Sequence, residues 1–239
     1  MSLSGQRVVI MGGSSGIGLA TAEAAAAAGA FVVVTGRDPG KLRAAGAALS
    51  DTAETTVVDA TSFDALKVFY KRLGSFDHLV LTVTGRVGGG PFSGLTIDAL
   101  RQAFEAKFFA YFMAMQAGLE ALSTGGSIVL VTASSARTSY AGTAGLAAVN
   151  GAIEAMVPTL ALELKPTRVN AVSPGIIDTP WWAEWPKEQR EAAFAQIAAS
   201  SPVGRIGQPE DIAQAILLLL ENSFMTGTII ECDGGIRIK

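Results

Sequence analysis

Short apolar runs alternate with longer segments of helical periodicity along the whole chain. The short runs are rich in β-branched residues and predict seven strands. They lie at Arg7–Met11, Phe31–Thr35, Thr55–Val58, His78–Val83, Ser127–Thr132, Arg168–Val172 and Thr228–Glu231. The longer segments predict helices at Ile17–Ala28, Lys41–Leu49, Phe63–Leu73, Ile97–Leu122, Thr143–Leu164, Lys187–Ala199 and Pro209–Leu220.

The predicted strands do not alternate between apolar and polar residues. Strands of that kind are buried on both faces, as in a parallel sheet covered by helices. Because strands and helices also alternate, we predict an α/β fold with a doubly wound parallel sheet of about seven strands and helices on both faces. No Pro/Ser-rich or charged linker divides the 239 residues, so we expect a single domain over residues 1–239.

The composition limits the partners that the protein can have. With 49% hydrophobic and 16% charged residues, the core should be large and part of the surface apolar, which predicts a homo-oligomer interface. A formal net charge of −3 provides no general attraction for nucleic acid, so we exclude nucleic-acid binding. The single Cys232 and the single His78 provide neither a disulfide nor a metal cluster, and we expect both to be structural.

The sequence carries no signal for a membrane or for export. No uncharged apolar run reaches the roughly 18 residues that a membrane helix requires. Residues 1–6 also lack the apolar stretch of a secretory signal. We therefore expect a protein without a membrane span that resides in the cytoplasm.

A glycine-rich turn joins the first predicted strand to the first predicted helix, with the sequence Gly12-Gly13-Ser14-Ser15-Gly16-Ile17-Gly18. Glycines permit a tight turn and a close approach of the backbone to a pyrophosphate. The free N–H groups at the start of the helix then bind its negative charge. A bare glycine pattern would be weak evidence, but the strand-turn-helix context predicts a phosphate-binding turn.

The GxxxGxG spacing of this turn and several later blocks resemble the short-chain dehydrogenase/reductase family. The blocks follow the family's order along essentially the whole chain, at Val57–Ala60, Arg168–Gly175, Gly204–Ala213, Thr226–Gly227 and Asp233–Gly235. The resemblance implies a seven-stranded Rossmann-like fold and a nicotinamide dinucleotide cofactor. It also implies a homodimer or homotetramer joined through long helices and the C-terminal segment.

The end of the second strand bears on the choice between NADP(H) and NAD(H). NAD-preferring members of the family usually place a carboxylate at Gly36 to bind the ribose hydroxyls, and glycine has no side chain. Arg37 could pair with a 2′-phosphate through a charge-assisted contact, so we predict NADP(H). NAD(H) stays open, because Asp38 could turn inward and Ser15 replaces a basic residue of many NADP(H) members.

The resemblance implies further contacts with the dinucleotide. Asp59 matches the residue that receives the adenine edge, with a simple turn cap as the alternative, and Ile177 and Thr179 match contacts to the nicotinamide carboxamide. The family's Asn-Asn-Ala-Gly is Thr82–Gly85 here, and only its glycine remains. The expected cofactor-binding residues are Gly12, Ser14, Ser15, Gly16, Ile17, Gly18, Arg37, Asp59, Ala60, Gly85, Asn150, Pro174, Gly175, Ile177 and Thr179.

The positions of the family's catalytic residues carry different chemistry. The family uses a tyrosine as proton donor and a lysine four residues later that lowers the tyrosine pKa. Those positions are Leu146, which has no ionisable group, and Asn150, a neutral amide that could still bind ribose. The family serine falls on Ala133, or on Ser134 if the loop shifts by one residue, and the family asparagine falls on Lys107.

Lys107 introduces a cation on a helix that should face the site. A desolvated lysine can transfer protons or neutralise an anionic ligand, so we treat Lys107 and Ser134 as candidate catalytic residues. The alternative for Lys107 is a structural side chain that reaches solvent or a backbone carbonyl. Tyr140 is six residues too early for the family tyrosine and has Ala144 at the lysine position, so we treat it as structural.

Residues 180–200 occupy the segment that forms a substrate lid in the family. Three indoles, those of Trp181, Trp182 and Trp185, would give an apolar cover that can stack on a ligand. We therefore predict a small-molecule ligand of apolar or aromatic character. The alternative is a lid that packs on the core or on a partner subunit.

Two function classes follow from this pattern. One is an NADP(H)-dependent oxidoreductase with an altered active site. The other is a catalytically silent dinucleotide-binding protein that acts as a sensor or as a partner of an active relative. The cofactor half of the pattern favours the first class, whereas Leu146 and Asn150 favour the second.

Overall fold

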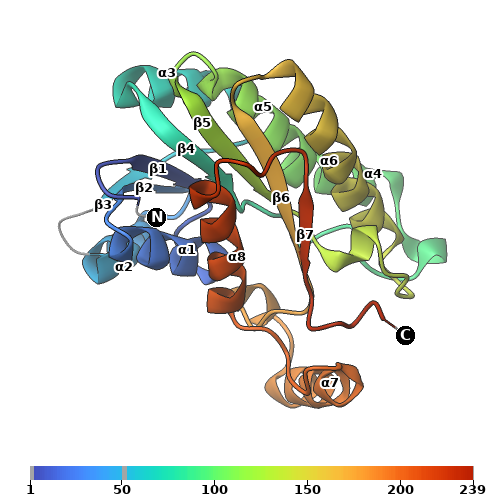
Figure 1. The fold of residues 1–239 in the computed structure, drawn as a ribbon. Coiled ribbons are helices and arrows are strands. Elements are labelled where there is room, and N and C mark those ends of the chain that lie inside the picture. Colours follow the sequence, from blue (N-terminus) through green and yellow to red (C-terminus); the bar gives the residue numbers. More distant parts are fainter. Residues whose placement is uncertain (1–2, 50–52, 239) are drawn as a thin grey trace.

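The computed structural model describes residues 3–49 and 53–238 and contains a seven-stranded parallel sheet (Figure 1). The strands follow the order β3-β2-β1-β4-β5-β6-β7, with the reversal between β1 and β4 that defines a doubly wound sheet. Their bounds are β1 Arg7–Met11, β2 Phe31–Gly36, β3 Ala53–Val57, β4 Phe76–Leu81, β5 Leu122–Val131, β6 Arg168–Pro174 and β7 Ile229–Cys232. The predicted fold class is confirmed.

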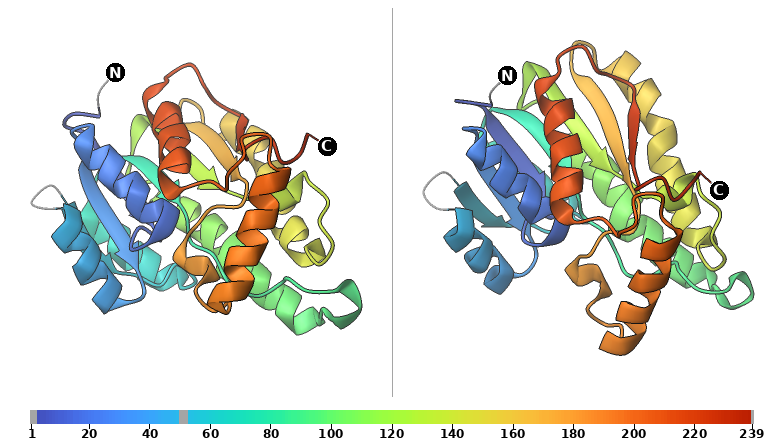
Figure 2. Two further views of the ribbon diagram at one scale, coloured as in Figure 1. Left: turned by 90° about the horizontal axis from the view of Figure 1, so that it is seen from below. Right: turned by 60° about the horizontal axis from the view of Figure 1, so that its bottom comes forward.

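Helices cover both faces of the sheet (Figures 1 and 2). One layer contains α1 Gly16–Ala27, α2 Pro39–Leu49 and α8 Pro209–Glu221. The other contains α3 Phe63–Leu73, α5 Ala110–Gly118 and α6 Ala144–Glu163, with α4 Ile97–Ala103 leading into it. The helix α7, Lys187–Ser200, lies outside both layers, beyond one end of the sheet.

The apolar strands explain why both faces are covered. In β1, Val8 and Ile10 pack in the cluster with α1 and α8, whereas Val9 and Met11 pack in the cluster with α3 and α5. All four side chains are fully buried. Because neighbouring side chains point to opposite faces, a strand without polar positions needs a helical layer on each side.

The prediction of one continuous helix over Ile97–Leu122 is wrong, because the helical segment is interrupted and ends earlier. The structure divides it into α4, a π-helical turn η3 at Phe104–Phe109, and α5, which ends at Gly118. Leu122 is the first residue of β5. The helix was predicted too long because the residues before Leu122 continue the apolar periodicity of a helix. The π-helical turn carries Lys107, which is buried there.

One helix among the described residues, α6, is long and apolar enough to cross a membrane by length and composition alone. It packs against the sheet through Val149, Ile153 and Val157, and it carries the buried carboxylate of Glu154. Core helices of globular domains share this composition. We therefore interpret α6 as a core helix whose outer face is apolar.

Candidate functional site

A cleft of about 350 Å³ lies at the carboxyl edge of the sheet, where the segments that follow the paired strands β1 and β4 lead to helices on opposite faces. Ligands of doubly wound sheets bind at this point. The cleft is lined by Gly12, Ser14, Ser15, Gly16, Ile17, Gly18, Thr35, Gly36, Arg37, Asp38, Lys41, Val58, Asp59, Ala60, Thr61, Thr82, Val83, Thr84, Arg86, Ala106, Ala110, Thr179, Pro180 and Trp181.

The amino end of α1 faces this cleft without a side-chain cap. Ser15 precedes the helix and makes no capping hydrogen bond, so the N–H groups of the first turn lack an intramolecular side-chain acceptor. A Cβ at Gly18 would lie 2.6 Å from Oγ1 of Thr82 and would also overlap the carbonyl oxygen of Gly12. This turn fits a pyrophosphate, because it lines the cleft at the uncapped amino end of α1.

One end of the cleft is lined by two cations, Arg37 and Lys41. The carboxylate of Asp38 already binds the backbone. Its Oδ1 accepts hydrogen bonds from the N–H groups of Gly40 at 2.7 Å and Lys41 at 3.1 Å, so this oxygen is less available to a ligand. These bonds lower the pKa of Asp38 and hold it at the start of α2. The arrangement suits an anionic ribose substituent.

Asp59 lines the same end of the cleft and caps a turn, which was the alternative role given to it from the sequence. Its Oδ1 accepts hydrogen bonds from the backbone N–H of Thr61 at 2.9 Å and from its hydroxyl at 2.8 Å. The backbone bond, together with the hydroxyl bond and the charge of Arg37, lowers the Asp59 pKa. Asp59 also lines the cleft, so the turn cap and an adenine contact are compatible.

The lid segment, residues 180–200, is hydrogen-bonded to the loop after β4 at the opposite end of the cleft. Nε1 of Trp181 donates to the carbonyl of Gly85 at 3.1 Å, and the Arg86 guanidinium donates to the carbonyl of Pro180 at 3.1 Å. Arg86 also forms an ion pair with Glu184. The residues that follow β4 therefore hold the lid in place.

Lys107 and Asn150 are in direct contact. The Lys107 amine donates to Oδ1 of Asn150 at 2.7 Å and to the carbonyl of Thr132 at 3.2 Å, and both side chains are buried. Burial lowers the pKa of Lys107 to about 7, and the charge of Glu154 opposes this shift. The amine can therefore exchange a proton near neutral pH.

The remaining hydrogen bonds of Asn150 stay within the protein. Its amide donates to the carbonyl of Leu146 at 2.9 Å and to the hydroxyl of Ser135 at 3.3 Å. The serine in contact with Asn150 is thus Ser135, whereas the predicted Ser134 is buried in the same short 3₁₀ helix. A ribose contact in which the Asn150 amide donates would require one of these two bonds to break.

Leu146, which we predicted at the position of the family tyrosine, packs against the glycine loop at residues 88–90 after β4. Its methyl groups would lie 3.7 Å from a Cβ at Gly88 or at Gly89. Gly90 of the same loop donates a backbone hydrogen bond to Gly142 at 2.8 Å. This loop therefore approaches the start of α6 directly.

The surroundings of Tyr140 oppose ionisation of its phenol. Partial burial raises its pKa, and the carboxylate of Asp233 raises it further. A proton-transfer tyrosine of this family needs the opposite shift, which a neighbouring ammonium provides. The expectation that Tyr140 is structural therefore agrees with its electrostatic surroundings.

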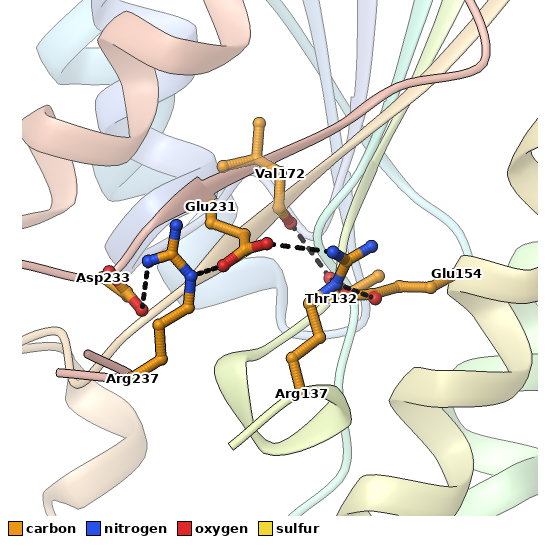
Figure 3. A network of polar contacts seen from close by, with 7 residues as sticks. All are labelled: Thr132, Arg137, Glu154, Val172, Glu231, Asp233 and Arg237. Carbon is orange, nitrogen blue, oxygen red and sulfur yellow. Dashed lines mark hydrogen bonds and ion pairs between the residues drawn. The ribbon is translucent and has the colours of Figure 1, made fainter. Parts of the chain in front are cut away.

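A network of charged groups fixes α6 to β7 behind these positions (Figure 3). Glu154 accepts hydrogen bonds from Oγ1 of Thr132 at 2.8 Å and from Nε of Arg137 at 2.7 Å. Arg137 also donates to Glu231 at 2.9 Å, and Arg237 pairs with Glu231 from the C-terminal segment. Glu154 is thus a paired buried carboxylate that stabilises the loop after β5.

The structure separates the expected site residues into two groups. The residues of the glycine turn line the cleft together with Arg37, Asp59, Ala60 and Thr179. The others do not line it: Gly85, Lys107, Ser134, Asn150, Pro174, Gly175 and Ile177. Gly175 and Ile177 instead line a second hollow of about 450 Å³ beside the C-terminal segment.

Sequence reasoning missed several residues that line the cleft. Lys41 lies four residues after Arg37 in the sequence, and this proximity could have identified it as a second cation at the same end. Arg86 directly follows the surviving glycine of the family motif. Thr82 carries no such signal, because its role depends on a hydrogen bond from its hydroxyl to the carbonyl of Met11 at 2.8 Å.

Comparisons with known proteins agree on one family of oxidoreductases. The family model described as enoyl-(acyl carrier protein) reductase matches residues 12–237. The chain is 32% identical to the short-chain dehydrogenase/reductase ATR9 of Stachybotrys chlorohalonatus, over 98% of each chain. It is 31% identical to the 3-oxoacyl-[acyl-carrier-protein] reductase FabG of Thermotoga maritima, over 100% of each chain.

Solved structures give the same result. A small-chain dehydrogenase in complex with NADPH is 31% identical, with a TM-score of 0.83 over 98% of this chain and 99% of that one. The MalC reductase/Diels-Alderase of Malbranchea aurantiaca is 27% identical, with a TM-score of 0.91 over 99% of this chain and 98% of that one.

Proposed function

Because the chain belongs to the short-chain dehydrogenase/reductase family, we propose that it is an NADP(H)-dependent oxidoreductase with an atypical mechanism. The observation that carries this proposal is the uncapped amino end of α1, which faces the cleft through Gly16, Ile17 and Gly18. A dinucleotide pyrophosphate matches the donors and the positive dipole end of this helix.

The preference for NADP(H) over NAD(H) rests on the other end of the cleft. Arg37 and Lys41 line it, Gly36 offers no carboxylate, and Asp38 is engaged at the start of α2. A 2′-phosphate would meet two cations there, whereas ribose hydroxyls would find no carboxylate at Gly36. The related dehydrogenase in complex with NADPH supports the same choice.

The bound dinucleotide would supply or accept a hydride, and the residues of this chain would hold it and handle protons. Leu146 cannot transfer a proton, and Asn150 cannot lower a neighbouring pKa. Among the residues at the four catalytic positions, Lys107 has a group that can exchange a proton near neutral pH. Ser134 remains the candidate for orienting a substrate oxygen.

A catalytically silent NADP(H)-binding sensor or partner subunit is the second candidate. It is favoured by the closed surroundings of the catalytic positions, because Leu146 packs near Gly88 and Gly89 and the cleft does not reach Lys107 or Asn150. Such a protein would bind the dinucleotide without turnover.

The two candidates are separated by titration and turnover. Purified protein is titrated with NADPH and with NADH by cofactor fluorescence, and NADPH oxidation is then measured with ketones, quinones, enoyl compounds and cationic C=N compounds. The proposal predicts tighter NADPH binding and turnover of at least one class. NADPH binding without turnover supports the silent candidate, and an unchanged rate in Lys107→Ala excludes Lys107 from proton transfer.

We also propose a homodimer or homotetramer that forms through the outer faces of α5 and α6. Phe109 at the end of η3 and Phe112 on α5 are about two-fifths exposed, and Leu162 on α6 is 67% exposed. An exposed apolar face of this kind is typical of a subunit interface. We propose a cytoplasmic location as well, as expected from the sequence.

A further inference from the structure

The seat of the general acid holds no proton donor in this chain. Reduction of a ketone leaves an alkoxide-like oxygen that a positioned acid must protonate. The side chain at that seat is the aliphatic Leu146, and the amine of Lys107 is bonded to Asn150 and Thr132 rather than exposed in the cleft. A substrate whose reduction requires no proton would suit this site.

An iminium ion is such a substrate. Its carbon accepts the hydride, the π electron pair of the C=N bond moves onto nitrogen, and the positive charge of the nitrogen is cancelled. The products are a neutral tertiary amine and the oxidised dinucleotide, so atoms and charge balance without a proton. Neither a tyrosine nor a lysine is needed to complete the step.

The lid places one indole ring, that of Trp181, on the cleft. Trp181 lines the cleft, and its ring centroid lies 4.6 Å from that of Trp182, which in turn lies 5.3 Å from Trp185 and 5.7 Å from Phe194. The faces of indole rings bind ammonium-type cations, and clustered rings recognise quaternary ones.

Two of these rings are held in fixed positions. Nε1 of Trp181 is bonded to the carbonyl of Gly85, and Nε1 of Trp182 to that of Ile177 at 2.9 Å. Rings that are fixed before binding lose less conformational entropy when a ligand arrives. Trp181 follows Thr179, the expected nicotinamide contact, by two residues, so the fixed ring lies near the hydride end of the cleft.

The charges at this end do not oppose a cation. Arg86 lines the cleft, but it is paired with Glu184 of the lid. Lys107 is buried behind the cleft and does not line it. We propose that the substrate is an iminium ion, a cationic C=N acceptor carrying apolar groups, bound against Trp181. This inference rests on the proposed NADP(H)-dependent activity.

Binding is tested first, without turnover. Protein saturated with NADPH, whose nicotinamide ring is uncharged, is titrated calorimetrically with N,N-dimethyl-1,2,3,4-tetrahydroisoquinolinium, which has no C=N bond to accept a hydride, and with its neutral isostere 2,2-dimethyltetralin. The cation should bind about 3- to 30-fold more tightly, which corresponds to a cation–π contribution of about 0.5–2 kcal/mol. Trp181→Leu should abolish this preference and Trp181→Phe should retain part of it. Equal binding of the two ligands to the unaltered protein would overturn the inference.

Turnover is tested second, with N-methyl-3,4-dihydroisoquinolinium and with 1-tetralone, a ketone of similar size. After subtraction of the reaction without protein, NADPH should be oxidised by the iminium and not by the ketone. Deuterium at C4 of NADPH should slow the reaction, whereas D₂O should not, because no proton moves in the step.

The failures of the two proposals are distinguishable. Absence of NADPH binding in the fluorescence titration refutes the proposed function and the inference together. NADPH binding with reduction of the ketone alone overturns the inference and leaves the oxidoreductase proposal intact. NADPH binding with reduction of neither compound overturns the inference and favours the silent candidate.

Discussion

At the residue scale, the predicted register exchanges a lysine and an asparagine relative to the family pattern. It assigns Lys107 to the asparagine position and Asn150 to the lysine position, and the two side chains are bonded at 2.7 Å. The amine extends from the π-helical turn, is buried and does not line the cleft. Its burial, and not an adjacent tyrosine, determines its proton affinity.

The buried amine makes stability depend on pH. Because the folded pKa of Lys107 is lowered from 10.5 to about 7, the unfolded chain binds more protons between these values, and folded stability rises with pH there. Relative to Lys107→Met, the unaltered protein should gain roughly 1.4 kcal/mol per pH unit above pH 7. Urea unfolding at pH 7, 8 and 9 measures this difference. A constant difference would show that the amine is not perturbed.

Arg37 is the residue on which cofactor preference depends. Loss of a charge-assisted contact to the 2′-phosphate costs roughly 1.5–3 kcal/mol, so Arg37→Ser should weaken NADPH binding about 10- to 100-fold and leave NADH binding nearly unchanged. Arg43→Ser on α2 is the matched control, because Arg43 is exposed and does not line the cleft. Equal effects on both dinucleotides would argue against a 2′-phosphate contact.

At the element scale, the junction of β1 and α1 requires glycine for steric reasons. Gly18→Ala places a methyl group against Oγ1 of Thr82 and the carbonyl of Gly12, so NADPH affinity should fall by about 100-fold or more. Gly151→Ala on α6 is the control, since a Cβ there meets nothing within 4 Å. It should keep NADPH affinity and raise stability by up to about 1 kcal/mol. Fluorescence titration and urea unfolding measure both, and unaltered NADPH affinity in Gly18→Ala would contradict the account.

The sequence predicted the elements better than the contacts between them. The bounds of β1 and α3 agree with the pattern because apolar periodicity is a local property. The π-helical turn and the Lys107–Asn150 contact could not be predicted, because they depend on packing between segments 43 residues apart. The contacts of Arg86 with the lid could not be predicted for the same reason, because its partners Pro180 and Glu184 are distant in the sequence.

At the scale of the whole molecule, the outer faces of α5 and α6 remain uncovered in a single subunit. Leu162→Glu combined with Phe112→Glu should convert the proposed oligomer to monomers, because the double substitution places charges in the proposed apolar interface. Val68→Glu on α3 is the control, since Val68 is 69% exposed and lies on a different helix. Sedimentation velocity gives the subunit number. A monomeric unaltered protein would contradict the proposed interface.

The central claim is that an intact dinucleotide site stands beside catalytic positions that have lost the tyrosine and the lysine. A crystal structure of the NADPH complex tests it most directly. We expect the pyrophosphate at the amino end of α1, the 2′-phosphate against Arg37, and Leu146 beside the nicotinamide with no tyrosine–lysine pair in reach. A tyrosine and a lysine together at C4 of the nicotinamide, or NADPH bound outside the cleft, would contradict the account.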